Sequence, residues 1–349
     1  MMVDQKSISK LQEQLKNCVV PIVGKKPIGK YISIPVISEL ECSGRFTTDG
    51  TSINTAIIQV NGNAVPVCKA HGRKQAASER RKAKELQRAL IANEMQKYDS
   101  KWSGCTMSVN DMCQNCPECV LFGSAASEGS ISITSRVMYD EAFTIRSPNA
   151  IVKNIFQGAP GDDYTKEPSS SIFEPDFLVE GTLFPRIITL KDVTFEEVLF
   201  MLNVIDRNSR YGATSSRFGK VRNHILGVYA GTREGPSSLE LTKGILEKLA
   251  NPEQKPTIEE IESVMLSDTL DINQVKKFAL ETYKKLSKQY RIPYDIEVTT
   301  VEVTNILEEL TDDIVKSTLV KQIEKTRSFL SKDNGSKGTA LKKPPTKKE

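Results

Sequence analysis

Histidine is nearly absent from this sequence of 349 residues, which has only two. With so few, no Ser/His/Asp or Cys/His catalytic arrangement can be argued from the sequence. Long apolar runs are missing as well, so no segment is expected to span a bilayer. The N-terminal segment 1–17 is polar and amphipathic and lacks the apolar stretch of a secretory signal. We therefore expect a soluble, cytoplasmic protein that does not contact a membrane.

A large excess of charge of one sign is also missing. The chain has 48 Lys and Arg residues against 44 Asp and Glu residues, which gives a net charge of +4. Such a small excess decides nothing, so the positions of the charges carry the information. Adjacent acids occur at 162–163 and 312–313, but acids of this kind in loops are usually solvated. The sequence therefore gives little support to an enzyme.

Cysteine is concentrated in one short stretch. This stretch holds four of the seven cysteines, namely Cys105, Cys113, Cys116 and Cys119. Zinc favours four soft ligands in a tetrahedron, and a C-x2-C spacing lets one turn supply two of them. Without a secretion signal, such a cluster favours a structural metal site over disulfides. Cys68 and His71 form a second candidate pair, so six ligands compete for four positions; a set of buried free thiols is the alternative.

A basic, glycine-rich stretch at 210–224 is the main candidate for binding. It reads RYGATSSRFGKVRNH and carries Arg210, Arg217, Lys220 and Arg222, with glycines at 212 and 219 and hydroxyls at 214–216. Glycine lets a backbone approach a ligand closely, and successive N–H groups in such a turn can form a concavity for anions. Arginine binds phosphate through two N–H groups at once. The stretch matches neither nucleotide-fold pattern, GxxxxGK[ST] or GxGxxG. It predicts a cradle for a phosphate backbone; a plain basic surface loop is the alternative.

Alternation and spacing predict an α+β fold. The expected strands are 30–42, 52–60, 63–67, 130–140, 181–190 and 221–230, and the expected helices are 73–96 and 194–208. In the first strand, Pro35 indicates a bulge or an edge position, and Asn61-Gly62 indicates a hairpin turn. Thr194 and Glu197 form a capping box. This order is compatible with a ferredoxin-like or RRM-like sheet, although the pattern alone does not select it over other α+β folds.

The chain divides into a core and a more helical part. We place the core at 1–235, with insertions at 43–130 and 143–177, a mainly helical region at 236–331 and a disordered basic tail at 332–349. The helical region should contain helices at 239–249, 257–267 and 273–290, a strand at 296–304 and an amphipathic stretch at 306–330. The insertion 143–177 is rich in turn residues and poor in core residues, which is typical of functional or disordered segments.

The helix 73–96 is strongly basic in its first half. Arg80 and Arg81 lie there among five other basic residues. Most charge runs of this kind are solvated helix faces. Next to a phosphate cradle, the same helix would instead act as a lid beside nucleic acid.

Three stretches resemble one known family. The spacing of the basic, glycine and hydroxyl residues in 210–220 resembles the glycine-rich loop of the RAMP superfamily of CRISPR proteins, which have modified RRM folds. CPECVLFGSA at 116–125 resembles the Cys-x-x-Cys-x-x-Phe-Gly segment of backbone subunits in type I and type III effector complexes. FLVEGTLFPRIITL at 177–190 resembles the segment by which their inserted hairpin returns to the sheet. The resemblance covers roughly 30–231 and is closest to the Csc-type crRNA-binding backbone protein of type I-D Cascade.

The resemblance implies a modified RRM or ferredoxin-like sheet with a zinc-bearing insertion. It also implies that 143–177 is a thumb-like hairpin that folds over the guide. Related subunits often use one histidine as a zinc ligand, which keeps His71 as a candidate. The protein would bind the crRNA backbone, oligomerise along it with other copies and other CRISPR effector subunits, and present the guide to target DNA or RNA. The residues that would contact RNA are Arg210, Ser216, Arg217, Lys220 and Arg222, with weaker candidates Lys30, Arg45, Arg80 and Arg81.

Two alternatives remain open at this point. Asp49 follows the first strand, where type III backbone subunits carry an aspartate that cuts target RNA, so the protein could be a target-cleaving nuclease of the same complex. The match is one of position and not of a sharp motif. The second alternative is a zinc-containing nucleic-acid-binding protein outside CRISPR systems.

Overall fold

The computed structural model describes most of the chain, namely residues 5–48, 50–98, 102, 105–108, 111–125, 132–154, 175–214, 216–289 and 295–331. Three predicted features lie outside these residues: Asp49, the larger part of the insertion 143–177, and the tail 332–349. Among the described helices, none combines the length and the apolar character needed to cross a bilayer.

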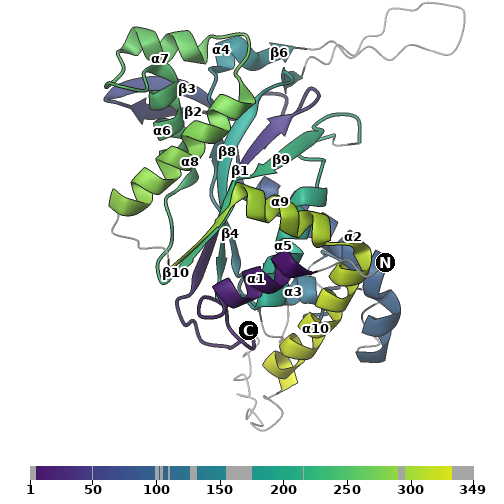
Figure 1. The fold of residues 1–349 in the computed structure, drawn as a ribbon. Helices are drawn as coiled ribbons and strands as arrows, with labels where there is room; N and C mark the ends of the chain where they lie inside the picture. Colours follow the sequence, from purple (N-terminus) through teal and green to yellow (C-terminus); the bar gives the residue numbers. More distant parts are fainter. Residues whose placement is uncertain are drawn as a thin grey trace, which may run out of the picture.

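A central antiparallel sheet organises the fold (Figure 1). Its middle strand is β1 (Tyr31–Leu40), which pairs along nearly its whole length with β8 (Leu183–Lys191). On the other side of β1, β9 (Val221–Ile225) lies beside the C-terminal half and β10 (Gly227–Gly231) beside the N-terminal half. With helices packed on this sheet, the α+β class predicted from the sequence is confirmed.

Two short strands complete the sheet at its edges. β4 (Val137–Tyr139) pairs with β8, and β11 (Ile296–Thr299) pairs with β10. The predicted strand 296–304 is wrong in its second half, although its β-branched alternation continues there. Thr299 caps the N–H of Glu302 and Glu302 caps that of Thr299, and this capping box starts a helix, α9 (Thr300–Glu309).

Pro35 lies in the centre of the sheet, so the expected edge position is wrong. The irregularity falls on the neighbouring strand instead, which is interrupted between Ile225 of β9 and Gly227 of β10. Opposite Pro35, the N–H of Leu226 donates to the Pro35 carbonyl at 2.9 Å. Because proline has no N–H, an interruption of the ladder here costs no hydrogen bond from Pro35 itself.

One face of the sheet carries the larger core. Ile32, Ile34 and Val36 of β1 point into it. It is covered by α1 (Lys6–Leu15), α2 (Gly72–Tyr98), α3 (Pro117–Phe122), α5 (Phe195–Arg207), α9 and α10 (Asp312–Ser331). The predicted capping box of Thr194 and Glu197 begins α5. Nearly all of α5 is buried, because α10 and the sheet pack on opposite sides of it.

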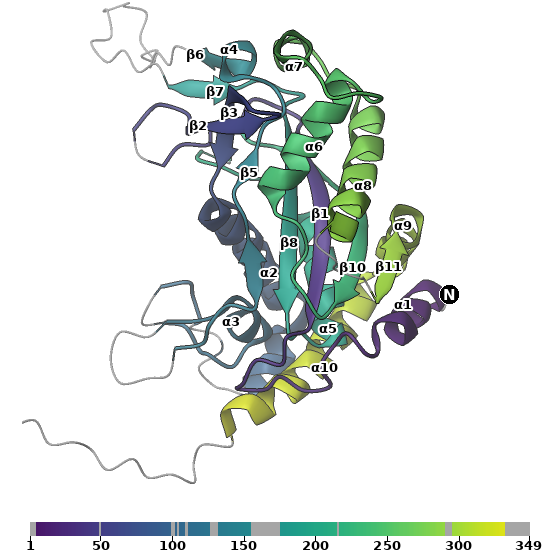
Figure 2. The ribbon, with the colours of Figure 1, turned by 90° about the vertical axis from the view of Figure 1, so that its left-hand side faces the viewer.

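The opposite face is covered by three helices. These are α6 (Ser238–Ala250), α7 (Ile258–Met265) and α8 (Ile272–Gln289). They bury Ile37 and Tyr229 of the sheet in a second core. Figure 2 shows α6 and α8 on the side of the sheet away from α2. The region 236–331 is therefore mainly helical, but its helices pack on both faces of the sheet.

Smaller elements gather at one end of the sheet, near the C-terminus of β1. β2 (Thr55–Val60) and β3 (Asn63–Ala70) form the predicted hairpin through Asn61-Gly62, and β5 (Ala142–Phe143) joins β3. Both turn residues have positive φ, 54° and 86°, as a type I′ turn requires.

The base of the insertion 143–177 lies at the same end (Figure 2). A short helix, α4 (Pro148–Ile151), leads into β6 (Val152–Asn154), which pairs antiparallel with β7 (Asp176–Leu178). The chain therefore leaves and re-enters the fold as two neighbouring antiparallel strands. The zinc-candidate helix α3 lies toward the other end.

Candidate nucleic-acid interface and metal centre

The glycine-rich loop, which we define as residues 209–221, connects α5 to β9. Its neck is closed by an antiparallel bridge between Arg210 and Lys220. Next to this bridge, the N–H of Val221 donates to the Ser209 carbonyl at 2.9 Å. The loop therefore leaves and re-enters the fold at one narrow point, and residues between 211 and 219 form its tip.

The two glycines allow the tip to pack on the protein itself. Gly212 and Gly219 have φ values of 88° and 71°, which L-residues rarely adopt. A Cβ on Gly212 would lie 2.4 Å from the Arg45 carbonyl oxygen, and one on Gly219 would lie 2.0 Å from that of Tyr211. The sequence suggested that these glycines bring the backbone close to a ligand. In the structure they bring it close to other backbone.

The backbone amides of the tip are largely engaged within the protein. Ala213 donates to the Arg45 carbonyl at 2.8 Å, and Arg217 and Phe218 donate to the Thr214 carbonyl at 3.0 and 3.1 Å. These three amides are therefore not available to an anion. The loop also presents exposed cationic side chains to solvent.

The strongest predicted RNA contacts all lie on this exposed side. They are Arg210, Ser216, Arg217, Lys220 and Arg222. Lys220 Nζ lies 3.2 Å from Glu41, and Arg222 forms a second ion pair with the same carboxylate. A hydrogen bond from Lys220, together with the charge of Arg222, holds the pKa of Glu41 below its ordinary value. An incoming phosphate would compete with Glu41 for these two cations.

Arg45 lies directly under the tip and is half-buried. Its Nη2 donates to the carbonyl of Gly50 at 3.0 Å. The base of the 143–177 insertion meets the same segment, since the N–H of Asp176 donates to the Thr51 carbonyl at 3.0 Å. The rings of Phe177 and Phe218 pack with centroids 4.6 Å apart. The loop, the segment after β1 and the insertion base thus converge.

Lys30 lies apart from this group. It precedes β1 at the far end of the ten-residue strand, which at about 3.3 Å per residue places it roughly 30 Å or more from the loop. Its Nζ donates to the Val19 carbonyl at 2.8 Å and its backbone N–H donates to Asp192. The structure therefore assigns Lys30 to the packing of the N-terminal segment and does not bring it to the predicted cradle.

The two arginines of α2 face different surroundings. Arg80 forms an ion pair with the buried Glu118 and donates to the Gly123 carbonyl at 2.7 Å, so it holds the cysteine-bearing insertion. Arg81 is exposed and lines an open groove of about 760 Å³ together with Arg88 and Met107. Of the pair, only Arg81 is available to a ligand.

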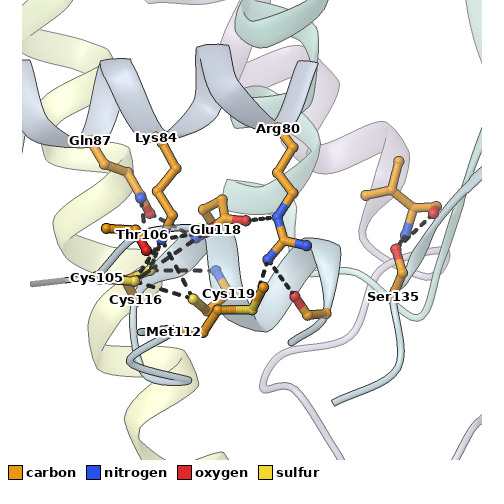
Figure 3. Close-up of polar contacts among 12 residues, drawn as sticks. Arg80, Lys84, Gln87, Cys105, Thr106, Met112, Cys116, Glu118, Cys119 and Ser135 are labelled. Atoms are coloured by element: carbon orange, nitrogen blue, oxygen red, sulfur yellow. Dashed lines mark hydrogen bonds and ion pairs between the residues drawn. The ribbon is translucent and has the colours of Figure 1, made fainter. Parts of the chain in front are cut away.

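The four cysteines of the predicted cluster lie together, and Figure 3 shows three of them, Cys105, Cys116 and Cys119, beside α2. All of their Sγ atoms lie within 4.8 Å of one another. The Sγ of Cys105 is 3.5 Å from that of Cys119 and 4.0 Å from that of Cys116. Sulfur atoms of a regular zinc tetrathiolate, with bonds of about 2.3 Å, are about 3.8 Å apart. The spacing therefore fits one tetrahedral zinc ion.

Local structure turns backbone amides toward these sulfurs. The N–H of Cys116 donates to Cys113 Sγ at 3.3 Å, and that of Cys119 donates to Cys116 Sγ at 3.4 Å. Pro117 begins α3, so Cys116 is its N-cap residue. The C-x2-C spacing thus works as predicted, with one tight turn orienting two thiols.

A buried lysine of α2 points into the cluster (Figure 3). Lys84 Nζ lies 2.7 Å from Cys105 Sγ, 3.6 Å from Cys116 and Cys119 Sγ, and 2.6 Å from Glu118. Burial by itself lowers the pKa of Lys84. The neighbouring anionic groups raise it by a larger amount, so the pKa lies above its ordinary value and the ammonium stays charged. Four thiolates around Zn²⁺ carry two net negative charges, and Lys84 is placed to offset one. No motif in the sequence predicts this contact.

The alternative ligands lie elsewhere. Cys68 is fully buried near Thr144 in another part of the core, and burial raises the pKa of its thiol to about 12. His71 Nδ1 lies 2.6 Å from Glu141. Across the described ranges, the four clustered cysteines are the one group arranged for a metal. Neither Cys68 nor His71 is needed to complete four ligands.

Comparison with known proteins decides the family. The model of the Csc2 CRISPR family matches residues 10–324. The chain belongs to the Csc2 CRISPR family. This assignment confirms the resemblance inferred from the three motifs, and it removes the alternative of a zinc protein outside CRISPR systems. No match is found among curated protein sequences.

A solved Csc2 structure shares the fold. The crystal structure of Thermofilum pendens Csc2 aligns with a TM-score of 0.60 and 18% identity, over 93% of this chain and 98% of that one. A chain of a CRISPR RNA-guided surveillance complex aligns more weakly, with a TM-score of 0.46 and 12% identity, over 83% of this chain and 99% of that one. At 18% identity, the likeness to the Thermofilum Csc2 shows a common fold.

Proposed function

We propose that this protein is a structural subunit of a type I-D Cascade-like effector complex that binds the crRNA backbone. The observation that carries the proposal is the set of exposed cations at the glycine-rich loop, led by Arg217 and Lys220. Arginine and lysine side chains of this kind contact phosphates and sugars, which carry no sequence information. Sequence recognition would then be left to base pairing of the guide with target DNA or RNA.

The sheet supports the same proposal. Along the chain the elements run β1, α2, β4, β8, α5 and β9–β10, and in space the strands run β9–β10, β1, β8, β4. We interpret this order as a modified RRM or ferredoxin-like sheet with both helices on one face. An ordinary RRM stacks bases on the other face. Here α6, α7 and α8 cover that face, which leaves the loop end of the sheet for RNA.

The insertion base next to the loop bears on assembly. Phe177 of β7 packs against Phe218 of the loop, so the chain enters the insertion directly beside the exposed cations. We propose that the insertion is the thumb-like hairpin of this subunit and reaches a neighbouring copy on the same guide. Copies joined head to tail in this way form an open filament along the RNA, because a heterologous interface of this kind does not close.

The cysteine cluster has a structural part in this proposal. Cys105, Cys113, Cys116 and Cys119 would hold one zinc ion, and a closed tetrathiolate site supplies folding energy and no open position for chemistry. Through Glu118, which contacts both Arg80 and Lys84, the insertion that carries the metal is fastened to α2. The zinc would therefore fix the insertion and the exposed groove at Arg81.

A nuclease role through Asp49 remains a second candidate. The specific observation in its favour is that Arg45, whose carbonyl accepts from Ala213 of the glycine-rich loop, also donates to the carbonyl of Gly50, the residue that follows position 49 in the sequence. Asp49→Ala should abolish target cleavage by an assembled complex if this residue cuts. If the variant cleaves the target as the wild type does, or if the wild type does not cleave at all, the nuclease role of Asp49 is rejected and only the structural role stands.

Salt-dependent RNA binding tests the main proposal. Single-stranded RNA of several sequences should bind with similar affinity, and the log–log dependence of the association constant on salt should flatten by about 0.7 for each phosphate contact removed. Arg217→Ala should produce this change for all sequences alike. Lys277→Ala, an exposed lysine on α8 on the other face, serves as the control and should leave the slope unchanged. A strong preference for one short sequence, or equal slopes for both variants, would contradict the proposal.

A further inference from the structure

A buried polar network lies under the glycine-rich loop, between α2 and the central sheet. At its centre, Arg186 of β8 and Glu79 of α2 form an ion pair with Nη1 and Oε1 2.6 Å apart. Only 2% of Arg186 and none of Glu79 is exposed. Arg186 Nε also donates to Ser38 Oγ of β1 at 2.8 Å. The pair therefore joins α2 to the two central strands.

Two tyrosine hydroxyls also donate hydrogen bonds to the Glu79 carboxylate. Tyr211, at the start of the loop tip, donates to Oε1 at 2.8 Å. Tyr139, on the edge strand β4, donates to Oε2 at 2.6 Å. Burial raises the pKa of both tyrosines above the ordinary value, so both hydroxyls remain donors. Arg186 Nη2 donates in turn to the Tyr211 hydroxyl at 3.1 Å.

The neck of the loop is held by the same network. Asn223 of β9 donates through Nδ2 to the Asn208 carbonyl at 3.0 Å and to the Tyr211 hydroxyl at 3.1 Å. Its Oδ1 accepts from Arg186 Nη2 at 3.1 Å. From α2, Ser78 Oγ donates to the Arg210 carbonyl. The loop is thus fastened at residues 208, 210 and 211 before it reaches solvent.

We infer that Tyr211 is a positioning residue for RNA binding, which holds the cations of the glycine-rich loop in place through Glu79 and Arg186. This inference rests on the proposed function of the loop. Its physical basis is the free-energy cost of burying charged groups. Once Arg186 and Glu79 are removed from water, every hydrogen-bonding group that their ion pair leaves unused needs a partner within the protein. The Tyr211 hydroxyl satisfies part of it, so the arrangement of the sheet and α2 dictates where the loop begins.

A matched pair of variants separates positioning from stability. Tyr211→Phe and Tyr139→Phe each remove one hydroxyl that donates to Glu79, and both keep the aromatic ring. Only Tyr211 belongs to the loop. Removing Arg186 or Glu79 would leave an unpaired buried charge and unfold the protein, so these residues are unsuitable for the test.

The measurements are hydrogen–deuterium exchange of loop amides in the free protein and binding of a labelled single-stranded RNA of mixed sequence. Tyr211→Phe should speed exchange in 210–220 and weaken RNA binding, each by at least about tenfold, because the lost hydroxyl donates to Glu79 and accepts from Arg186 and Asn223. Tyr139→Phe should change neither, although it also lowers the melting temperature, by less than Tyr211→Phe does because its hydroxyl contributes the bond to Glu79 and not the bonds to Arg186 and Asn223. If Tyr211→Phe fails to fold, Ser78→Ala replaces it, since it leaves the buried ion pair intact and removes a hydroxyl that donates to the Arg210 carbonyl and accepts from Asn208 Nδ2 at 3.0 Å.

The outcomes are distinct for the inference and for the function on which it rests. Faster loop exchange with weaker RNA binding, confined to the loop variant, supports both. If the wild type binds no RNA but the loop still loosens in Tyr211→Phe, the proposed function fails and the positioning of the loop stands. Equal effects of the two tyrosine variants on loop exchange, or a loosened loop with unchanged RNA affinity, would overturn the inference.

Discussion

Substituting Gly219 by alanine should disable the loop far more than substituting a matched glycine elsewhere. Gly219 has φ of 71°, and Gly181, in the turn before β8, has φ of 70°. Both substitutions place an L-residue in the left-handed region. A Cβ at Gly181 meets nothing within 4 Å, whereas one at Gly219 meets the Tyr211 carbonyl oxygen at 2.0 Å. The comparison therefore isolates the steric contact from the backbone penalty.

The magnitudes follow from these two contributions. The left-handed conformation costs an alanine about 1–2 kcal/mol, and this should be nearly the whole loss of unfolding free energy for Gly181→Ala. An overlap with backbone costs about 1–3 kcal/mol more in a packed site, so Gly219→Ala should lose about 2–5 kcal/mol. If the loop backbone instead shifts to separate Gly219 from the Tyr211 carbonyl, the stability cost is smaller, but the loop cations lose their fixed positions.

Denaturant unfolding and RNA binding are measured on both variants. Gly219→Ala should weaken RNA binding at least about tenfold, because either the steric overlap or the backbone shift that relieves it displaces the cations of the loop. Gly181→Ala should bind RNA as the wild type does. Equal losses of stability together with equal RNA affinities would show that the close packing of Gly219 has no bearing on binding, and would refute the reasoning.

Three further predictions concern the metal centre and the charges of the loop. Elemental analysis should find about one zinc per chain, and Cys119→Ser should lose it and destabilise the insertion; metal-free protein of unchanged stability would contradict this. Lys84→Met should release zinc to a colorimetric chelator several-fold faster, because the thiolate charge is no longer offset, while Arg81→Met on the same helix should release it at the wild-type rate. Glu41→Gln should tighten RNA binding up to about fivefold, since an exposed ion pair is worth roughly 0.2–1 kcal/mol; unchanged affinity would show that the cations beside Glu41 do not reach the RNA.

Local chemistry determined much of this protein directly from its sequence. The capping box of Thr194 and Glu197 begins α5 as predicted, and Asn61-Gly62 turns the β2–β3 hairpin. The C-x2-C spacing before α3 assembles thiols through a single turn. The basic loop exposes its cations. Each of these features depends on residues within a few positions of one another, so the pattern and the structure have the same cause.

What the tertiary structure decided depends on contacts between distant segments. Glu79 and Arg186 are 107 positions apart, and no spacing in the sequence relates the acid of a basic helix to a lone arginine in an apolar strand. Of the loop glycines, Gly212 packs against Arg45, which only the fold brings near, whereas Gly219 packs against Tyr211 of the same loop. Lys30 looked equivalent to Arg45 because both flank β1, but a strand separates its ends by its full length. Contacts across the core depend on how helices and strands pack, and not on distance along the chain. In the sequence, such contacts are visible only as isolated charged residues within apolar segments.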